Sequence, residues 1–380
     1  MYFVNNSVEN KILVSGTINL MFALSKKNKS GRWVLALIVA LAVIVRIYNL
    51  DLGPELPPEY RASVVFSILA GIASVAGFYF LVKELFDEKL ALIASFLLAV
   101  SSWHVFISKL DTKDILTSFT LTFAFYFIWR GLKSGRIFDF FLAGLAGGAG
   151  FYAGRSYFPA FLVVLLLFWN YWDYIKKDFP FSKYEEVKAN ILSGFALLVL
   201  ITVATILPVG FYVWQNPELI LSTDNSIFAN TEPIIQIFKN ISWAVDKLLL
   251  IKFDGTNFIS WPLSIFFAIG FIKELVHWLK RKHGHFSVAH TLIFGWLFIM
   301  TVPTLLSADR PSILGLGIIL PPIMILAAKG LWWTIEKLNV WNHLVYPRQH
   351  RHWAGLDVAP FLALLALLVS IAILEISKTI

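Results

Sequence analysis

Long apolar runs alternate with short polar connections along most of this chain. A helix needs about 20 mostly apolar residues to cross the hydrocarbon core of a bilayer, and runs near that length recur throughout the sequence. They lie at residues 33–50, 62–82, 90–107, 115–129, 138–153, 157–172, 191–214, 259–279, 289–306, 312–333 and 360–376. These runs lack the polar face that a helix of a soluble protein keeps toward water. The pattern predicts an all-α, polytopic membrane protein with about 11 transmembrane helices.

The longest predicted non-spanning segment, residues 215–258, shows a different periodicity. Within it, apolar residues recur at intervals of four and three, which is the spacing of one face of a helix. They are Ile234, Phe238, Ile241, Val245 and Leu248. We expect an amphipathic helix here that lies along the membrane interface.

Composition supports the membrane assignment. Hydrophobic residues make up 58% of the chain and charged residues 15%, with a mean hydropathy of +0.72, outside the usual balance of a soluble domain. The sequence holds no cysteine, so disulfide bonds and thiol catalysis are excluded.

The net charge of +8 first suggests a nucleic-acid partner, but the position of the basic residues argues against one. Lysines and arginines gather in every second connection, as the positive-inside rule expects of cytoplasmic loops. These residues are Lys26, Lys27, Lys29, Arg32, Lys83, Lys89, Arg130, Lys133, Arg136, Lys176, Lys177, Lys183, Lys188, Lys280, Arg281, Lys282, Lys337, Arg348 and Arg351. We predict a multi-pass protein of the plasma membrane, with a cytoplasmic segment 1–32, one transmembrane domain 33–380 and the 215–258 segment outside.

With this topology, carboxylates collect at the outer face. The first outer connection, within RIYNLDLGPELPPEYRAS, carries Asp51, Glu55 and Glu59, and the second, KLDTKDIL, carries Asp111 and Asp114. Such carboxylates can take a proton from a hydroxyl. The alternative is that loop charges are merely solvated and that Asp114 caps a helix N-terminus.

Outer-face cations accompany these carboxylates. Arg155 lies between two apolar runs, and later outer connections carry Asp254 and Arg310. Arginine forms strong charge-assisted hydrogen bonds with phosphate, so the set could hold a phosphate beside an activated hydroxyl. His283 and His285 in KRKHGH lie in a basic inner connection, and we interpret them as loop charge and not as a metal site.

Several stretches carry a family resemblance. Residues 103–160, beginning WHVFISKLDTKDILTSF and ending GGAGFYAGRSYFPA, resemble the GT-C glycosyltransferases that use polyprenyl-phosphate sugars, such as the protein mannosyltransferases and bacterial family 39 enzymes. The preceding RASVVFSILAGIASVAGFYF is similar to the second span of that family, and RIYNL to the end of its first. GLGIILPPIMILAAKGL is similar to a late span.

The resemblance implies a membrane transferase that inverts the anomeric carbon. An outer carboxylate would act as general base on an acceptor hydroxyl of a glycan, lipid or protein, and polyprenyl phosphate would leave. By position, Asp114 matches a family acidic residue and Arg155 the short third outer loop. No cofactor is assigned, although some members use a divalent metal ion.

The first outer connection lacks the adjacent Asp–Glu pair of the family. The resemblance therefore assigns Glu59, with Asp51 and Asp114, to catalysis, and Glu55, Asp111, Arg155, Asp254 and Arg310 to substrate binding. The alternative function is a catalytically inactive GT-C scaffold or a lipid or sugar transporter.

Overall fold

The computed structural model describes residues 30–48, 50, 57–110, 114–178, 180–216, 232–249, 259–280, 285–307, 313–345 and 359–378. Of the predicted site residues, Asp51, Glu55, Asp111, Asp254 and Arg310 lie outside the described residues.

Every secondary-structure element in these ranges is a helix. In chain order they are α2 (Ser30–Ile47), α3 (Pro58–Leu85), α4 (Glu88–Val100), α5 (Ser102–Lys109), α6 (Asp114–Ser134), α7 (Ile137–Gly150), η2 (Arg155–Tyr157), α8 (Ala160–Asp178), α9 (Phe181–Gln215), α11 (Pro233–Leu249), α12 (Trp261–Lys280), α13 (His285–Ile299), α14 (Val302–Leu305), α15 (Ile313–Leu316), η4 (Gly317–Ile319), α16 (Leu320–Val345) and α17 (Ala359–Ile376). The predicted all-α class is confirmed.

Each predicted apolar run contains a helix, but not all of these helices are long and apolar enough to cross a bilayer. Among the described residues, six stretches are: Pro58–Leu85, Asp114–Ser134, Val187–Gln215, Trp261–Lys280, Ser287–Leu305 and Gly317–Lys337. A seventh is the pair α4 and α5, if the two count as one span bent by 55°. Ile137–Gly150 and Leu362–Ile376 are shorter apolar helices, so the predicted number of spans is not confirmed.

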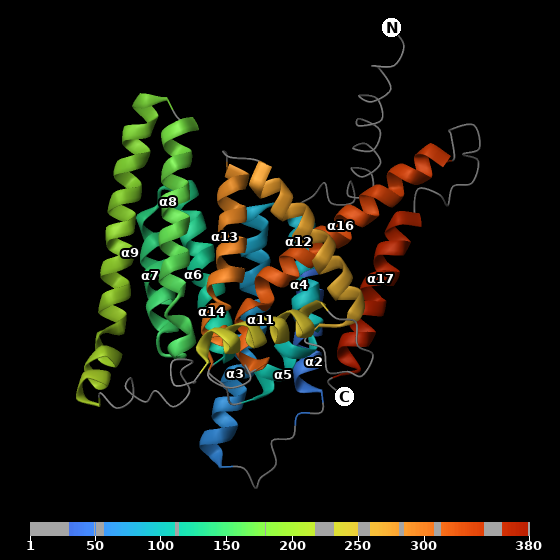
Figure 1. Ribbon diagram of the computed structural model, residues 1–380, viewed down its shortest axis with the longest axis horizontal. Helices are drawn as coiled ribbons and strands as arrows, with labels where there is room; N and C mark the ends of the chain where they lie inside the picture. The colour runs from blue at the N-terminus through green and yellow to red at the C-terminus, as the bar shows by residue number, and fades with distance from the viewer. Residues whose placement is uncertain are drawn as a thin grey trace.

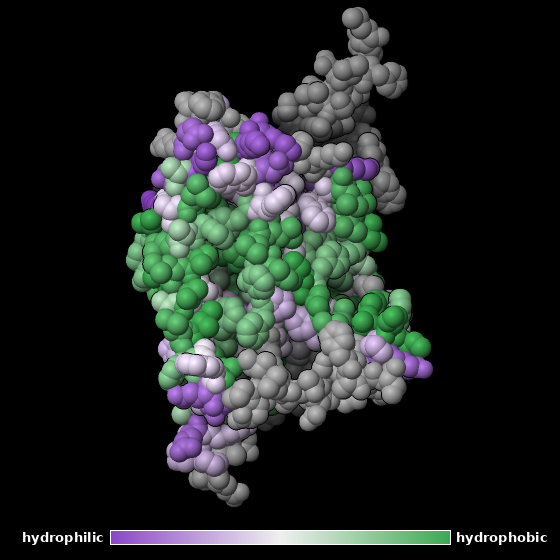
Figure 2. Space-filling model, turned by 60° about the vertical axis from the view of Figure 1, so that its left-hand side comes forward, coloured by the Kyte–Doolittle hydropathy of each residue, from purple (hydrophilic) through white to green (hydrophobic). Residues whose placement is uncertain are grey.

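The helices form an elongated bundle whose surface is banded. A wide apolar belt separates two polar ends (Figure 2), which is the surface that a bilayer requires. α3 and α6 pack side by side and begin at the same end of the bundle, at the bottom of Figure 1. We call this the outer end, after the prediction from loop charge, and the opposite one the inner end.

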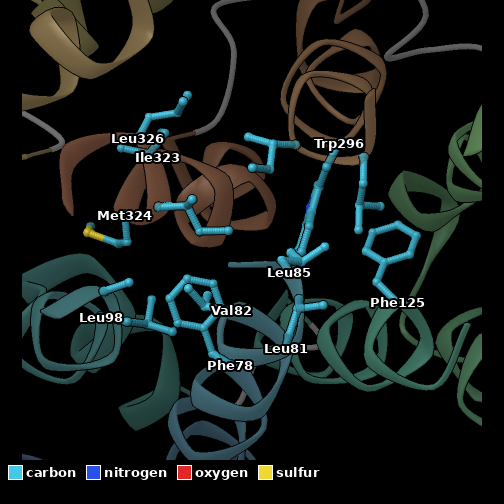
Figure 3. Packing of buried hydrophobic residues seen from close by; sticks show 14 of the residues in the cluster. Phe78, Leu81, Val82, Leu85, Leu98, Phe125, Trp296, Ile323, Met324 and Leu326 are labelled. Atoms are coloured by element: carbon cyan, nitrogen blue, oxygen red, sulfur yellow. The ribbon is translucent and has the colours of Figure 1, made fainter. Parts of the chain in front are cut away.

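The core joins the first and last parts of the chain (Figure 3). Phe78, Leu81 and Val82 of α3 pack in one buried cluster with Phe125 of α6, Trp296 of α13 and Met324 of α16. The indole of Trp296 lies 4.9 Å from the Phe125 ring, centroid to centroid, and donates a hydrogen bond to the Ile318 carbonyl at 3.0 Å. This contact fixes the late helices against the early ones.

Small residues let two helix pairs approach closely. A Cβ atom at Gly148 of α7 would lie 2.5 Å from Thr205 Cβ on α9, and one at Gly270 of α12 would lie 1.8 Å from the Leu326 carbonyl oxygen on α16. Small residues at helix crossings are typical of membrane bundles. The glycine-rich GGAGFYAG stretch therefore contributes Gly148 to a packing surface.

The predicted amphipathic helix is present as α11, which runs across the other helices at the outer end (Figure 1). The side of α11 that faces the bundle is fixed by Asn240, whose amide donates to the carbonyls of Leu305 at 2.9 Å and Ser307 at 3.0 Å. Ile234 and Phe238 on its apolar stripe are exposed. An exposed apolar stripe beside the apolar belt is the geometry expected of an interfacial helix.

Candidate active site

Asp114 is the first residue of α6 and lies half-buried at the outer end. A capping carboxylate accepts a hydrogen bond from the backbone of the next helical turn. Asp114 makes no hydrogen bond or ion pair with any other described residue. The contacts of the described residues therefore give no support to the capping alternative.

Glu59 also lies at the outer end, but it is not brought close to Asp114. A Cβ atom at Gly77 of α3 would lie 2.7 Å from the Phe123 ring of α6, so the matching position for Asp114 is near Ile68. Glu59 is a further nine residues toward the start of α3, or about 13 Å at 1.5 Å per residue. It is exposed on the part of α3 that projects beyond the bundle (Figure 1).

Arg155 begins the short helix η2, which follows the end of α7. Tyr157, two residues on, is buried, and its hydroxyl is hydrogen-bonded to the Thr120 side chain of α6. The contact fixes η2 against the outer third of α6, within a few turns of Asp114.

An apolar cavity lies on the inner side of η2, between α6, α7, α8 and α9. Its volume is about 230 Å³, and its wall includes Phe125, Gly147, Tyr157, Phe161 and Val203. Phe161 and Val203 are also exposed on the surface of the bundle, so the cavity opens toward the lipid side.

The polar groups of the cavity wall are already satisfied. Tyr157 bonds to Thr120, and the hydroxyl of Thr202 donates to the Gly144 carbonyl at 3.3 Å. An apolar cavity with no free polar partner stays dry and binds apolar molecules. The cavity suits a hydrocarbon chain and offers no group for chemistry on a sugar.

Beneath the outer end, Arg46 is fully buried within α2. It donates to the Ala42 carbonyl at 2.9 Å and to His104 Nδ1 of α5 at 2.6 Å. Since arginine only donates, His104 accepts at Nδ1 and carries its proton on Nε2. Sequence reasoning treated Arg46 only as the flank of a loop.

Glu375 of α17 is a second buried charge that sequence reasoning missed. It accepts three hydrogen bonds, from the Ser102 backbone N–H at 2.9 Å, the Ser102 hydroxyl at 2.6 Å and the Ser260 backbone N–H at 2.6 Å. A single carboxylate inside the apolar run 360–376 was the available signal, because an ionisable residue within a span usually has a specific partner.

The described part of the chain contains no candidate metal site. No group of three or more His, Asp or Glu side chains there is close enough to hold an ion. The use of a divalent metal stays a prediction, since Asp51, Glu55 and Asp111 lie outside the described residues.

Comparisons with known proteins agree on the fold. The family model described as dolichyl-phosphate-mannose-protein mannosyltransferase matches residues 59–207, which run from the start of α3 into α9. YkcB of Bacillus subtilis (strain 168), to which a mannosyltransferase activity has been ascribed, is 29% identical over 103 residues, or 26% of this chain and 14% of YkcB.

Among solved structures, the oligosaccharyltransferase of Archaeoglobus fulgidus tethered to an acceptor peptide superposes with a TM-score of 0.59 at 12% identity. The match covers 93% of this chain and 55% of that one. The same archaeal protein, bound to an inhibitory peptide and a dolichol-phosphate, gives a TM-score of 0.50 at 12% identity, covering 91% and 51%. This chain thus spans about half the length of that oligosaccharyltransferase and a small part of YkcB.

These matches confirm the fold that the resemblance implied. The protein has the GT-C fold of integral membrane glycosyltransferases.

Proposed function

We propose that the protein transfers a sugar from a polyprenyl-phosphate carrier to a hydroxyl of a glycan, lipid or protein at the outer face of the membrane. The observation that carries this proposal is the half-buried carboxylate of Asp114, with which no described residue pairs, near a lipid-facing apolar cavity on the inner side of η2. The carboxylate can accept the proton of a hydroxyl, and the cavity can hold the hydrocarbon chain of a carrier.

In the proposed reaction, Asp114 accepts the proton of the acceptor hydroxyl as its oxygen attacks the anomeric carbon. The bond from that carbon to the phosphate oxygen breaks, and polyprenyl phosphate leaves with the electron pair. Attack opposite the leaving group inverts the anomeric carbon. A positioned general base contributes about 10²- to 10⁴-fold to rate. Arg155, at the start of η2, is the candidate ligand of the phosphate.

The proposal favours Asp114 over Glu59 as the base. Glu59 is exposed on the projecting end of α3, about 13 Å along the helix axis from the level of Asp114. A hydroxyl bound by one carboxylate is therefore out of reach of the other. Asp51, Glu55 and Asp111 stay candidates for orienting the acceptor, and Asp254 and Arg310 for binding it.

The transporter alternative is less well supported. Transport sites in membranes usually place ionisable groups near the bilayer midplane. Two of the buried charges lie at helix ends here, Arg46 next to the last residue of α2 and Glu375 next to the last residue of α17, whereas Glu274 and Lys329 lie within α12 and α16. Glu274, six residues from the end of α12, is paired with Lys329 at 2.8 Å.

Label transfer from polyprenyl-phosphate sugars tests the proposal directly. The purified protein in nanodiscs is incubated with a panel of radiolabelled donors and extracted acceptors, and polyprenyl phosphate release is followed in parallel. Asp114→Asn should lower turnover by about 10²-fold or more with donor affinity unchanged. Arg155→Ala should instead weaken donor binding, by about 2–3 kcal/mol for a lost charge-assisted pair.

Two residues near the inner end supply matched controls. Asp173→Asn removes a carboxylate that, among the described residues, pairs only with Lys177, and Arg136→Ala removes an exposed cation; both should keep full activity. Full activity in the Asp114 and Arg155 variants would refute the site. Movement of a labelled lipid or sugar across proteoliposomes, without transfer, would establish the transporter instead.

A further inference from the structure

Helix α5 links the bundle to the segment that leads into Asp114, and it is too short to hold a direction alone. It has eight residues and leaves α4 at an angle of 55°. Isolated helices below about 12 residues are marginal in water because nucleation is costly. The direction of α5 must therefore come from its contacts with other helices.

The buried carboxylate of Glu375 holds the start of α5. Its Oε2 accepts from the backbone N–H and hydroxyl of Ser102, and its Oε1 from the backbone N–H of Ser260 at the start of α12. The first N–H groups of a helix have no partner inside the helix. Glu375 thus caps two helices from a third.

The residues that would normally cap these helices do not do so. Ser101 is the N-cap residue of α5 but makes no capping hydrogen bond, and the hydroxyls of Ser101 and Ser260 have no hydrogen-bond partner in the described part of the chain. The positive ends of two helix dipoles meet at Glu375. They offset part of the cost of burying its charge, which no described cation neutralises through an ion pair.

Arg46 makes a second contact with α5. Its Nη2 donates to His104 Nδ1 at 2.6 Å, two residues beyond the Glu375 contact. A Cβ atom at Gly71 of α3 would lie 3.1 Å from Arg46 Nε and 2.7 Å from Ser108 Cβ, so α2, α3 and α5 meet without spare room. The last residue of α5, Lys109, donates to the Tyr48 carbonyl at 2.8 Å.

We propose that Glu375 and Arg46 are positioning residues for the candidate active site, an inference that rests on the proposed function. Together they fix the direction of α5. α5 ends five residues before Asp114 and contacts both α3 and α6, the two helices whose register sets the level of Asp114, so a change in its direction would displace the Asp114 carboxylate relative to the acceptor. Neither residue touches substrate, and both act through α5. Misplacement of a reacting group by about 1 Å can cost 10²-fold in rate.

The direction of α5 is measured first, without any assay of transfer. The sequence has no cysteine, so two introduced cysteines can be spin-labelled specifically. Phe106 on α5 and Phe66 on α3 are 45% and 59% exposed and are suitable positions. Pulsed electron paramagnetic resonance should give one narrow distance in the parent protein and a shifted or broadened one in Glu375→Gln.

The amide of Glu375→Gln can accept only at its oxygen and so loses one of the two helix caps. Arg46→Lys, which replaces a planar fork with a point charge, should also broaden the distance. Lys378→Gln changes a charge two residues after α17 ends, at an exposed position, and should not. Unchanged distances in Glu375→Gln and Arg46→Lys would overturn the proposal.

Transfer kinetics then separate positioning from general loss of structure. Glu375→Gln should lower turnover by about 10- to 100-fold with donor affinity within about twofold. If it acts through Asp114, it should have almost no further effect on the residual turnover of Asp114→Asn. An equal loss in both backgrounds would refute a role through Asp114. If the parent protein transfers no sugar at all, the proposed function fails, while the spin-label distances still decide whether Glu375 and Arg46 fix α5.

Discussion

The apolar cavity between α6, α7, α8 and α9 allows a direct test of the carrier lipid, because a side chain at Gly147 would fill it. Gly147 lines the cavity, and a Cβ atom there would meet only Thr202 Oγ1, at an ordinary 3.7 Å. Gly147→Leu should therefore fold and occupy space that the hydrocarbon chain of the donor would otherwise take.

The expected magnitude follows from the number of carbon atoms displaced. Compared with Gly147→Ala, leucine adds three carbons, worth about 0.8 kcal/mol each and about 2.4 kcal/mol together. This value is an upper bound, since the displaced chain returns to lipid and not to water. It corresponds to a loss of donor affinity of up to about 50-fold.

Donor affinity is measured for two carriers with the same sugar, one with a full polyprenyl chain and one with a single isoprene unit. Gly147→Leu should weaken binding of the long carrier and leave the short one nearly unchanged. Gly147→Ala controls for the gain in helix propensity, about 1 kcal/mol. Gly210→Leu controls for added apolar surface, because a Cβ atom there meets nothing within 4 Å.

The comparison between carriers decides the outcome. An equal loss for long and short carriers would mean that Gly147→Leu disturbs the protein elsewhere. Unchanged affinity for both would mean that the chain of the carrier does not enter this cavity. Either result would refute the assignment.

Three further predictions concern topology and stability. A reporter fused after Arg136 should be cytoplasmic and one after Asp254 external, as loop charge requires; the reverse accessibility would move the carboxylates to the wrong face. Glu274→Gln should lower the unfolding free energy by about 3–5 kcal/mol, because Lys329 would keep a buried charge without its partner. Recovery of stability in a double variant with Lys329→Met would confirm this cause. An unchanged unfolding midpoint in the single variant would contradict it. Gly270→Ala should lower the thermal midpoint more than Gly210→Ala, since its Cβ atom would lie 1.8 Å from a backbone carbonyl of α16.

The elements of this fold could be predicted from the sequence to an unusual degree, because the bilayer restricts the choice. Apolar runs of span length have few structures open to them in lipid, so each run proved helical. The four-and-three spacing around Phe238 likewise predicted α11, and the apolar stripe that it marks is exposed.

The break between α4 and α5 could not be predicted in the same way. Residues 90–107 read as one apolar run, and neither glycine nor proline marks the bend at Ser101. The contact that we propose to fix the direction of α5 joins Ser102 and Glu375, which are 273 residues apart in the sequence. No local pattern connects them.

The candidate site was predicted only in part for a related reason. The sequence indicated correctly that Asp114 starts a helix. It did not show how far along the axis of the bundle each side chain lies, so Glu59 and Asp114 were assigned to one site although they lie at different levels. Depth depends on the register between α3 and α6, which is set by packing at Gly77 and Phe123 and leaves no periodic signal.

The distance in sequence between Ser102 and Glu375 also has a consequence for synthesis. Ribosomes add about 5–20 residues per second, so the 273 residues that separate the two take about 14–55 s to make. During that time α5 exists without the carboxylate that caps it. A nascent chain can thus insert its early spans long before Glu375 holds the start of α5, and α17 must arrive before that contact can form.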